Sequence, residues 1–258
     1  MTLEIRNLTV SFDSRRVVDI DSLELGDAEI VALAGESGSG KSMTALAVVG
    51  LASTKGATVA GSIKLDGTEL IGMPQSELRA IRGGRISMIF QSPVSSFDPV
   101  FRIGTIFRGA LQLHGASRAE ARDRAAEAMR GVMLAPELLD RYPHQLSGGQ
   151  AQRVAIALAI ALRCEVLLAD EPTSALDVTV QGEILELLRR LREQERMAIL
   201  FISHDLAVVA ELCDRVAVMR MGRIVEVGPA AEVLRAPSDP YTRELIASVP
   251  KLTSAAAG

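Results

Sequence analysis

The eight residues Gly35–Ser42 constrain this chain more than any other part of its sequence. They read Gly-Glu-Ser-Gly-Ser-Gly-Lys-Ser, between an apolar run, Ile30–Ala34, and a segment of helical composition, Met43–Gly50. The string fits G-x-x-x-x-G-K-[ST], a loop whose backbone N–H groups cradle phosphates while the lysine reaches the terminal phosphates and the hydroxyl ligates Mg²⁺. A phosphate at a helix N-terminus also meets unpaired N–H donors and the positive end of the helix dipole. Strand, loop and helix in this order predict an α/β fold.

A glycine-rich surface turn could hold a lysine and a serine by chance, but the flanking strand and helix favour nucleotide binding. The candidate nucleotide contacts in this segment are Gly35, Glu36, Ser37, Gly38, Ser39, Gly40, Lys41, Ser42 and Met43.

Composition limits the classes of protein that need to be considered. With 258 residues, 48% of them hydrophobic, the chain can form one large α/β domain or two small lobes. It has no run of about 18 apolar residues, and Met1–Ser11 lacks a signal-peptide pattern, so we expect a soluble, cytoplasmic chain. The net charge of −4, without any Lys/Arg run, argues against nucleic acid as a partner. Cys164 and Cys213 lack metal-ligand spacing and are expected to be buried, reduced thiols.

The first quarter of the chain carries strand patterns. Leu3–Phe12 and Gly61–Gly67 look like half-buried strands, and the second ends in an Asp-Gly pair typical of a hairpin turn. These segments predict an antiparallel β-subdomain.

Strand signals fade between residues 92 and 161, where Ser117 and Glu120 form a capping-box pattern at the start of an alanine-rich stretch. We expect a helical lobe there. Apolar strands return at Val166–Asp170 and Met197–Ile202. Between them lies a helical face, formed by Ile184, Leu187, Leu188 and Leu191. This alternation of strand and helix predicts a mostly parallel sheet.

Polar residues follow three of the apolar segments. Asp170 ends the strand Val166–Asp170 and Glu171 follows it, at the carboxyl edge where ligands collect in open α/β sheets, although two adjacent acids could be merely solvated. Gln91 follows the apolar strand Ile86–Phe90, and His204 follows Met197–Ile202. Taken alone, a loop glutamine or a single histidine is usually structural.

A second glycine-containing string consists of Leu146, Ser147, Gly148, Gly149 and Gln150. Ser147 is a candidate helix N-cap, and the two glycines would let a phosphate approach the backbone of the helix that continues through Arg153. The plain alternative is an ordinary helix start.

The order of these motifs along nearly the whole chain resembles that of the ABC transporter ATPases. The resemblance implies an α/β ABC ATPase nucleotide-binding domain with a RecA-like P-loop core, an antiparallel β-subdomain and an inserted α-helical subdomain. The implied segments are 1–91 for the β-subdomain and first part of the core, 92–161 for the helical signature subdomain, 162–236 for the second part of the core, and 237–258 for a C-terminal appendage.

The resemblance also implies a role for each motif around ATP and Mg²⁺. Ser42, Gln91 and Asp170 would form the Mg²⁺ site, and Lys41 would neutralise phosphate charge. Glu171 would orient or deprotonate the attacking water, and His204 would contact the γ-phosphate.

The remaining motifs concern the adenine base of ATP and a second ATPase subunit. Leu146–Gln150 would bind the γ-phosphate of an ATP held by the opposing subunit, and Asp177 would be the D-loop acid at the dimer interface. Phe12 stands where the family places an aromatic side chain that stacks on adenine, although a core phenylalanine is nearly as good an interpretation.

Four strings narrow the resemblance to peptide/nickel importer ATPases: Gly35–Leu46, Phe90–Pro99, Asp177–Gln181 and Asp239–Arg243. Ser42–Leu46 looks like the first of that family's two ATPase types, so a heterodimer with a second, paralogous ATPase is expected and a homodimer is possible. Two membrane permeases and an external solute-binding protein are the other implied partners, which would place the chain peripherally at the cytoplasmic face of the membrane. Many peptide-type members carry a cysteine-bearing C-terminal extension that this sequence lacks, which favours the shorter nickel type.

Three alternatives remain at this point. A stand-alone ABC ATPase of translation or chromosome maintenance would generally show tandem units or long coiled coils, and neither pattern occurs here. A module that senses ATP without hydrolysing it would not need Glu171 and His204. An exporter would be favoured by fused membrane spans, which this sequence does not contain.

Overall fold

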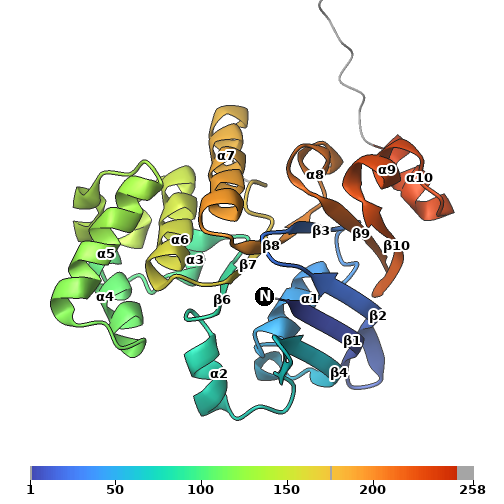
Figure 1. The fold of residues 1–258 in the computed structure, drawn as a ribbon, viewed down its shortest axis with the longest axis horizontal. Helices are drawn as coiled ribbons and strands as arrows, with labels where there is room; N and C mark the ends of the chain where they lie inside the picture. The colour runs from blue at the N-terminus through green and yellow to red at the C-terminus, as the bar shows by residue number, and fades with distance from the viewer. Residues whose placement is uncertain (1, 175, 249–258) are drawn as a thin grey trace, which may run out of the picture.

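The computed structural model describes residues 2–174 and 176–248, which form two sheets and a set of surrounding helices (Figure 1). The smaller sheet is antiparallel in the order β2–β1–β4–β5, and the larger sheet has the order β10–β9–β3–β8–β7–β6. The strands of the smaller sheet are β1 (Leu3–Phe12), β2 (Arg15–Leu25), β4 (Thr58–Leu65) and β5 (Thr68–Glu69). Those of the larger sheet are β3 (Ile30–Ala34), β6 (Ile86–Ile89), β7 (Val166–Asp170), β8 (Ala198–Ser203), β9 (Arg215–Arg220) and β10 (Arg223–Pro229).

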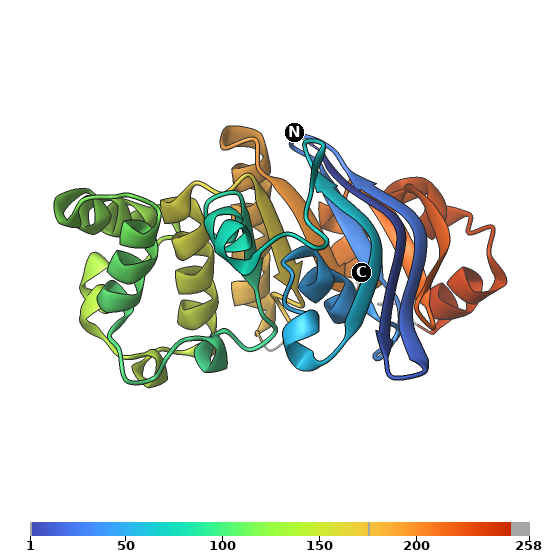
Figure 2. The same cartoon turned by 90° about the horizontal axis from the view of Figure 1, so that it is seen from below.

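The helices lie around these sheets, and the lobe α4–α6 occupies the end of the molecule opposite α9 and α10 (Figures 1 and 2). The α-helices are α1 (Lys41–Val48), α2 (Gln75–Ile81), α3 (Pro93–Ser96), α4 (Ile103–Leu113), α5 (Arg118–Gly131), α6 (Gly148–Leu162), α7 (Val178–Gln194), α8 (Leu206–Leu212), α9 (Ala230–Arg235) and α10 (Pro240–Ala247). Short 3₁₀ turns lie at Ser53–Lys55, Pro136–Asp140 and Pro143–Gln145.

The larger sheet is the structural centre because both of its faces are buried. Leu167 and Ala169 of β7 face an apolar cluster shared with the helical lobe, whereas Val166 and Leu168 face a second cluster shared with α1 and the smaller sheet. Side chains alternate between the two faces of a strand, so a strand buried on both faces reads as a continuous apolar run. All pairings from β6 to β9 are parallel, and β10 adds an antiparallel edge, which confirms the mostly parallel sheet.

Most of the predicted elements are confirmed. The strands β1, β3 and β7 coincide residue for residue with the predicted ones. At the end of β4, Asp66 and Gly67 have φ values of 46° and 78° and connect directly to β5, as a two-residue Asp-Gly turn requires. In the helical lobe, the backbone N–H of Glu120 donates to Ser117 Oγ at 3.2 Å, and that of Ser117 donates to Glu120 Oε2 at 2.7 Å, so the capping box is present.

Four strands, β2, β5, β9 and β10, are not among the predicted elements. In β2, the buried residues are Val18, Ile20, Leu23 and Leu25, while charged residues such as Arg16 and Glu24 occupy the exposed positions. As the outer strand of a sheet with one solvated face, β2 is half polar and lacks the continuous apolar run that identified β3 and β7.

The two cysteines differ in their surroundings. Cys164 is buried, as predicted, and burial raises the pKa of its thiol to about 11. Cys213 is only partly covered. Neither forms a disulfide within the described part of the chain.

The segment that precedes α10 folds back onto β10. The carboxylate of Glu226 accepts hydrogen bonds from the backbone N–H and hydroxyl of Ser238, at 2.8 and 2.6 Å, and from the N–H of Asp239 at 3.2 Å. These contacts fix the start of α10 (Figure 1). The predicted tail Thr253–Gly258 lies outside the described residues. Within residues 2–174 and 176–248, no helix is both long and apolar enough to span a bilayer.

Glu226 makes the stability of this region dependent on pH. Burial raises the pKa of Glu226, but the hydrogen bonds from Ser238, Thr242 and Asp239 outweigh it and lower the pKa from 4.5 to about 2. A carboxyl group whose pKa is lower in the folded state stabilises the fold at pH values above its unfolded pKa. It loses that contribution as the pH falls from the unfolded pKa to the folded pKa. We therefore expect Glu226→Gln to cost about 1 to 2 kcal/mol of unfolding free energy at neutral pH. Urea unfolding across pH should show this difference shrinking below pH 4.5; a difference independent of pH would contradict it.

Candidate nucleotide-binding and hydrolysis site

The strand β3 delivers the chain into the glycine loop, and α1 begins at Lys41. Gly35 has φ 148°, and a Cβ atom there would lie 2.1 Å from the carbonyl oxygen of Met219. Gly40 has φ 110°, and its Cβ would lie 2.7 Å from the carbonyl oxygen of Val17. Both positions therefore require glycine, because the loop is pressed between β2 and β9.

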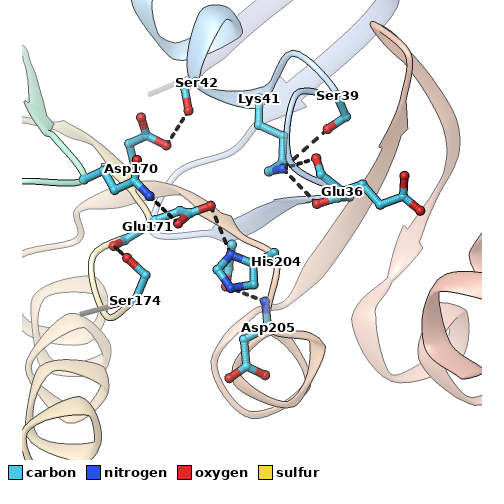
Figure 3. Close-up of polar contacts among 12 residues, drawn as sticks. Glu36, Ser39, Lys41, Ser42, Asp170, Glu171, Ser174, His204 and Asp205 are labelled. Atoms are coloured by element: carbon cyan, nitrogen blue, oxygen red, sulfur yellow. Dashed lines mark hydrogen bonds and ion pairs between the residues drawn. The ribbon is translucent and has the colours of Figure 1, made fainter. Parts of the chain in front are cut away.

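Lys41 is folded back into its own loop (Figure 3). Its Nζ donates to the carbonyl oxygens of Gly35 and Glu36, both at 2.8 Å, and lies 3.4 Å from Ser39 Oγ. Only 5% of the residue is exposed, and this burial lowers its pKa despite the nearby charges of Glu171 and Asp170. Within the described residues, no carboxylate lies within ion-pair distance of Nζ. The ammonium group is thus held by carbonyl dipoles, which an anionic ligand can replace.

Ser42 and Asp170 meet beneath the loop. Ser42 Oγ donates to Asp170 Oδ1 at 2.9 Å, across 128 residues of sequence (Figure 3). Asp170 is 6% exposed, and burial raises its pKa. A hydroxyl and a carboxylate side by side are hard oxygen ligands of the kind that Mg²⁺ prefers, and the charge of a cation would relieve the cost of burying the carboxylate. These two residues therefore fit a magnesium site.

Glu171 is held from two sides. Gln91 Nε2 donates to its Oε2 at 2.8 Å, and His204 Nδ1 lies 3.0 Å from its Oε1. The three residues follow β6, β7 and β8, whose carboxyl ends lie at one edge of the sheet. The side chain of Glu171 is 15% exposed and that of His204 is 58% exposed, so the group borders open solvent. The backbone of Glu171 has φ 49°, a left-handed conformation that few non-glycine residues adopt and that often marks a functional position.

The signature string lies at the start of α6. Ser147 caps the helix as predicted, accepting the backbone N–H of Gln150 at 3.2 Å. Gly148 is exposed with open space around it, whereas a Cβ at Gly149 would lie 2.8 Å from Cγ1 of Val180 in α7. Within the described residues, no hydrogen bond or ion pair joins this string to the phosphate loop. The structure leaves the signature separate from the Lys41 and Glu171 cluster of the same chain.

Two further predicted residues have simpler surroundings. Asp177 is exposed and caps α7, accepting the N–H of Val180 at 3.0 Å, so it lies beside the signature helix. Phe12 is partly buried and packs against the apolar cluster beneath the smaller sheet. That packing accommodates a core role, and its adenine contact stays a prediction.

One contact to the phosphate loop was not predicted. The hydroxyl of Tyr241 in α10 accepts a hydrogen bond from the backbone N–H of Glu36 at 3.2 Å. The sequence signals the start of α10 through Asp239-Pro240, but nothing in the sequence pairs that helix with a loop 205 residues away.

Comparison with known proteins agrees with this geometry. The family model described as ABC transporter matches residues 18–174. A Brucella abortus protein, named as a candidate peptide import ATP-binding protein, is 44% identical over 257 residues, covering 97% of this chain and 77% of its own length. The dipeptide transport ATP-binding protein DppD of Haemophilus influenzae is 41% identical over 256 residues, covering 96% of this chain and 78% of its own length.

Among solved structures, the dimeric post-hydrolysis state of the ATP-binding cassette MJ0796 bound to ADP and Pi superimposes with a TM-score of 0.78. It is 27% identical, and the match covers 88% of this chain and 98% of that one. The resemblance seen in the motifs is therefore confirmed together with the ABC ATPase fold. This chain belongs to the ABC transporter family, as one of its ATP-hydrolysing subunits.

Proposed function

We propose that this chain binds MgATP at the phosphate loop and hydrolyses it in a dimer of ATPase subunits that drives peptide uptake through separate permeases. The observation that carries the proposal is the Glu171 carboxylate, held between Gln91 and His204 and next to the Ser42–Asp170 pair. In this arrangement residues 1–91 and 162–236 hold the nucleotide, residues 92–161 present the signature, and residues 237–258 are an appendage.

Binding begins with an exchange of partners at Lys41. Phosphate oxygens of ATP replace the carbonyl oxygens of Gly35 and Glu36 around Nζ, and the N–H groups of the loop and of the start of α1 donate to the same phosphates. Ser42 and Asp170 would hold Mg²⁺, with Gln91 near it, and the ion would supply positive charge that neutralises the phosphates. Phe12 would stack on adenine.

Hydrolysis then depends on Glu171. Its carboxylate accepts a proton from, or orients, the water that attacks the γ-phosphate in line with the departing ADP. Gln91 and His204 fix the direction of that carboxylate, and His204, being largely exposed, can turn toward the γ-phosphate. A positioned general base contributes roughly 10²- to 10⁴-fold to a rate.

A second subunit completes the site. Because no hydrogen bond or ion pair among the described residues joins the signature to the phosphate loop of its own chain, Leu146–Gln150 are available to an ATP held by an opposing subunit, with Asp177 at the interface. The similar cassette MJ0796 is dimeric in its post-hydrolysis state, which supports this arrangement. We propose a paralogous ATPase as the partner, with a homodimer as the alternative, and we propose that two permeases hold the pair peripherally at the membrane with an external binding protein as solute donor.

ATP turnover by the purified chain, alone and mixed with its paralogous ATPase, tests this requirement. We expect turnover to rise with the square of subunit concentration at low concentrations, because the active species is a dimer. Turnover proportional to concentration in a sample that remains monomeric by light scattering would contradict the composite site.

The two signature glycines offer a matched pair of variants. Gly149→Ala presses a methyl group against Val180, and overpacking of this kind costs about 1 to 3 kcal/mol, so we expect a lower melting temperature. Gly148→Ala meets nothing within 4 Å in the single chain, so we expect unchanged stability. Its turnover should nevertheless fall at least about tenfold, because the added methyl group keeps the opposing phosphate from the backbone. Full turnover by Gly148→Ala in the assembled transporter would contradict the role of the signature.

The relatives favour peptides as the solute, because those compared carry names that refer to peptide or dipeptide transport. The nickel alternative rests on the sequence resemblance alone.

A further inference from the structure

Tyr241 connects α10, the last described helix, to the phosphate loop. Its side chain is buried, with 4% of the residue exposed, and the guanidinium of Arg220 lies 4.7 Å from the ring centroid. The hydroxyl accepts the backbone N–H of Glu36 at 3.2 Å. The tyrosine lies outside residues 18–174, the part that matches the family model.

Glu36, the residue that donates to Tyr241, also contacts the phosphate-binding lysine. The carbonyl oxygen of Glu36 accepts Lys41 Nζ at 2.8 Å and the N–H of Ser39 at 3.2 Å. Both backbone polar groups of Glu36 are therefore engaged, one by the C-terminal helix and one by the phosphate-binding lysine. The carbonyl oxygen of Gly35, which also accepts Lys41 Nζ at 2.8 Å, belongs to the same peptide unit as the Glu36 N–H, so a turn of Lys41 toward a phosphate would change the geometry at the tyrosine hydroxyl.

The same part of the chain supports the loop at two other points. The backbone N–H of Gly222 donates to the carbonyl oxygen of Ser39 at 2.8 Å, and the carbonyl oxygen of Met219 lies where a Cβ of Gly35 would be. Met219, Gly222 and Tyr241 thus all contact the phosphate loop.

The position of Tyr241 is itself fixed by hydrogen bonds. The side chain of Asp239 accepts the backbone N–H of Tyr241 at 2.8 Å, and Glu226 of β10 accepts the N–H of Asp239 at 3.2 Å. Figure 1 shows α10 lying beside β10, the edge strand of the larger sheet. A chain of hydrogen bonds therefore runs from β10 through the helix cap to the loop.

We propose that Tyr241 is a positioning residue for the phosphate loop, through which nucleotide binding and the docking of α10 are coupled. The proposal rests on the proposed function of the loop as the nucleotide site. The coupling is reciprocal: the free energy by which the docked helix strengthens nucleotide binding equals the free energy by which bound nucleotide stabilises the docking of the helix. A single neutral hydrogen bond contributes about 0.5 to 1.5 kcal/mol, which corresponds to about 2- to 10-fold in affinity.

The first test removes only the hydroxyl. Tyr241→Phe retains the buried ring over Arg220, and we expect it to bind MgADP about 2- to 10-fold more weakly than the natural chain by calorimetry, with kcat for ATP nearly unchanged and KM raised. Tyr142→Phe, at the other tyrosine of the chain, is the control and should bind MgADP normally. Natural affinity in Tyr241→Phe, with or without a lower melting temperature, would overturn the proposal. Failure of the natural chain to bind MgADP would instead overturn the proposed nucleotide site.

A second test leaves Tyr241 intact. The chain contains two tyrosines and no tryptophan, so Tyr142→Phe leaves Tyr241 as the sole source of tyrosine fluorescence. Titration with MgADP, corrected for absorption by the nucleotide, should change the emission of Tyr241 with the dissociation constant found by calorimetry. Tyr241→Phe, which retains only Tyr142, should show no such change. Constant emission from Tyr241 through saturation would overturn the coupling.

Discussion

Replacing Glu171 with glutamine is expected to lower ATP turnover by about 10²- to 10³-fold while nucleotide binding remains close to that of the natural chain. Glutamine has the same length and can still accept a hydrogen bond from Gln91, but it cannot take a proton from water. The left-handed backbone conformation at position 171 costs glutamate and glutamine the same free energy, so the melting temperature should stay the same. Steady-state phosphate release and calorimetric titration with MgATP measure the two effects separately.

The control for this experiment is Glu186→Gln. Glu186 is an exposed acid of α7 whose side chain pairs with Arg189, and its substitution should leave turnover unchanged. If Glu171→Gln retained substantial steady hydrolysis, Glu171 would not be the residue that activates water.

Replacing Lys41 with methionine is expected to weaken MgATP binding by about 10- to 100-fold. The ammonium group makes charge-assisted contacts with phosphate, which are worth about 1.5 to 3 kcal/mol. Methionine has a similar length and carries no charge that must be desolvated on burial, so the melting temperature should change little although binding is weakened. Calorimetry and thermal unfolding distinguish this outcome from simple misfolding. Binding of MgATP with natural affinity would exclude Lys41 from the site.

The sequence predicts the central part of this fold because burial leaves a direct pattern. Ile30–Ala34 and Val166–Asp170 are buried on both faces, so each strand is a continuous apolar run bounded by polar residues. Carboxyl ends of parallel strands meet at one edge, and for this reason residues as distant as Ser42 and Asp170, or Glu171 and His204, could be expected together. The edge strand β2 gave a weaker signal because half of its side chains face solvent.

Contacts without a periodic pattern could not be predicted. The hydrogen bond from Glu36 to Tyr241 joins residues 205 positions apart in the sequence, and it depends on the way in which Glu226 and Asp239 set the start of α10. The proposed function of the signature is equally hidden in one chain, because in that proposal the phosphate that it binds is held by another subunit. In the proposed transporter the solute is recognised by proteins outside this chain, so no residue that contacts ATP identifies the solute.

The most direct test of the whole account is ATP hydrolysis by this chain reconstituted in membranes with its paralogous ATPase, two permeases and the solute-binding protein. The binding protein would be supplied empty, loaded with short peptides, or loaded with chelated nickel. We expect peptide-loaded binding protein to stimulate hydrolysis above the empty one, and Glu171→Gln to abolish the stimulation. Stimulation by nickel alone would contradict peptide uptake, and hydrolysis indifferent to every form of the binding protein would contradict coupling to import.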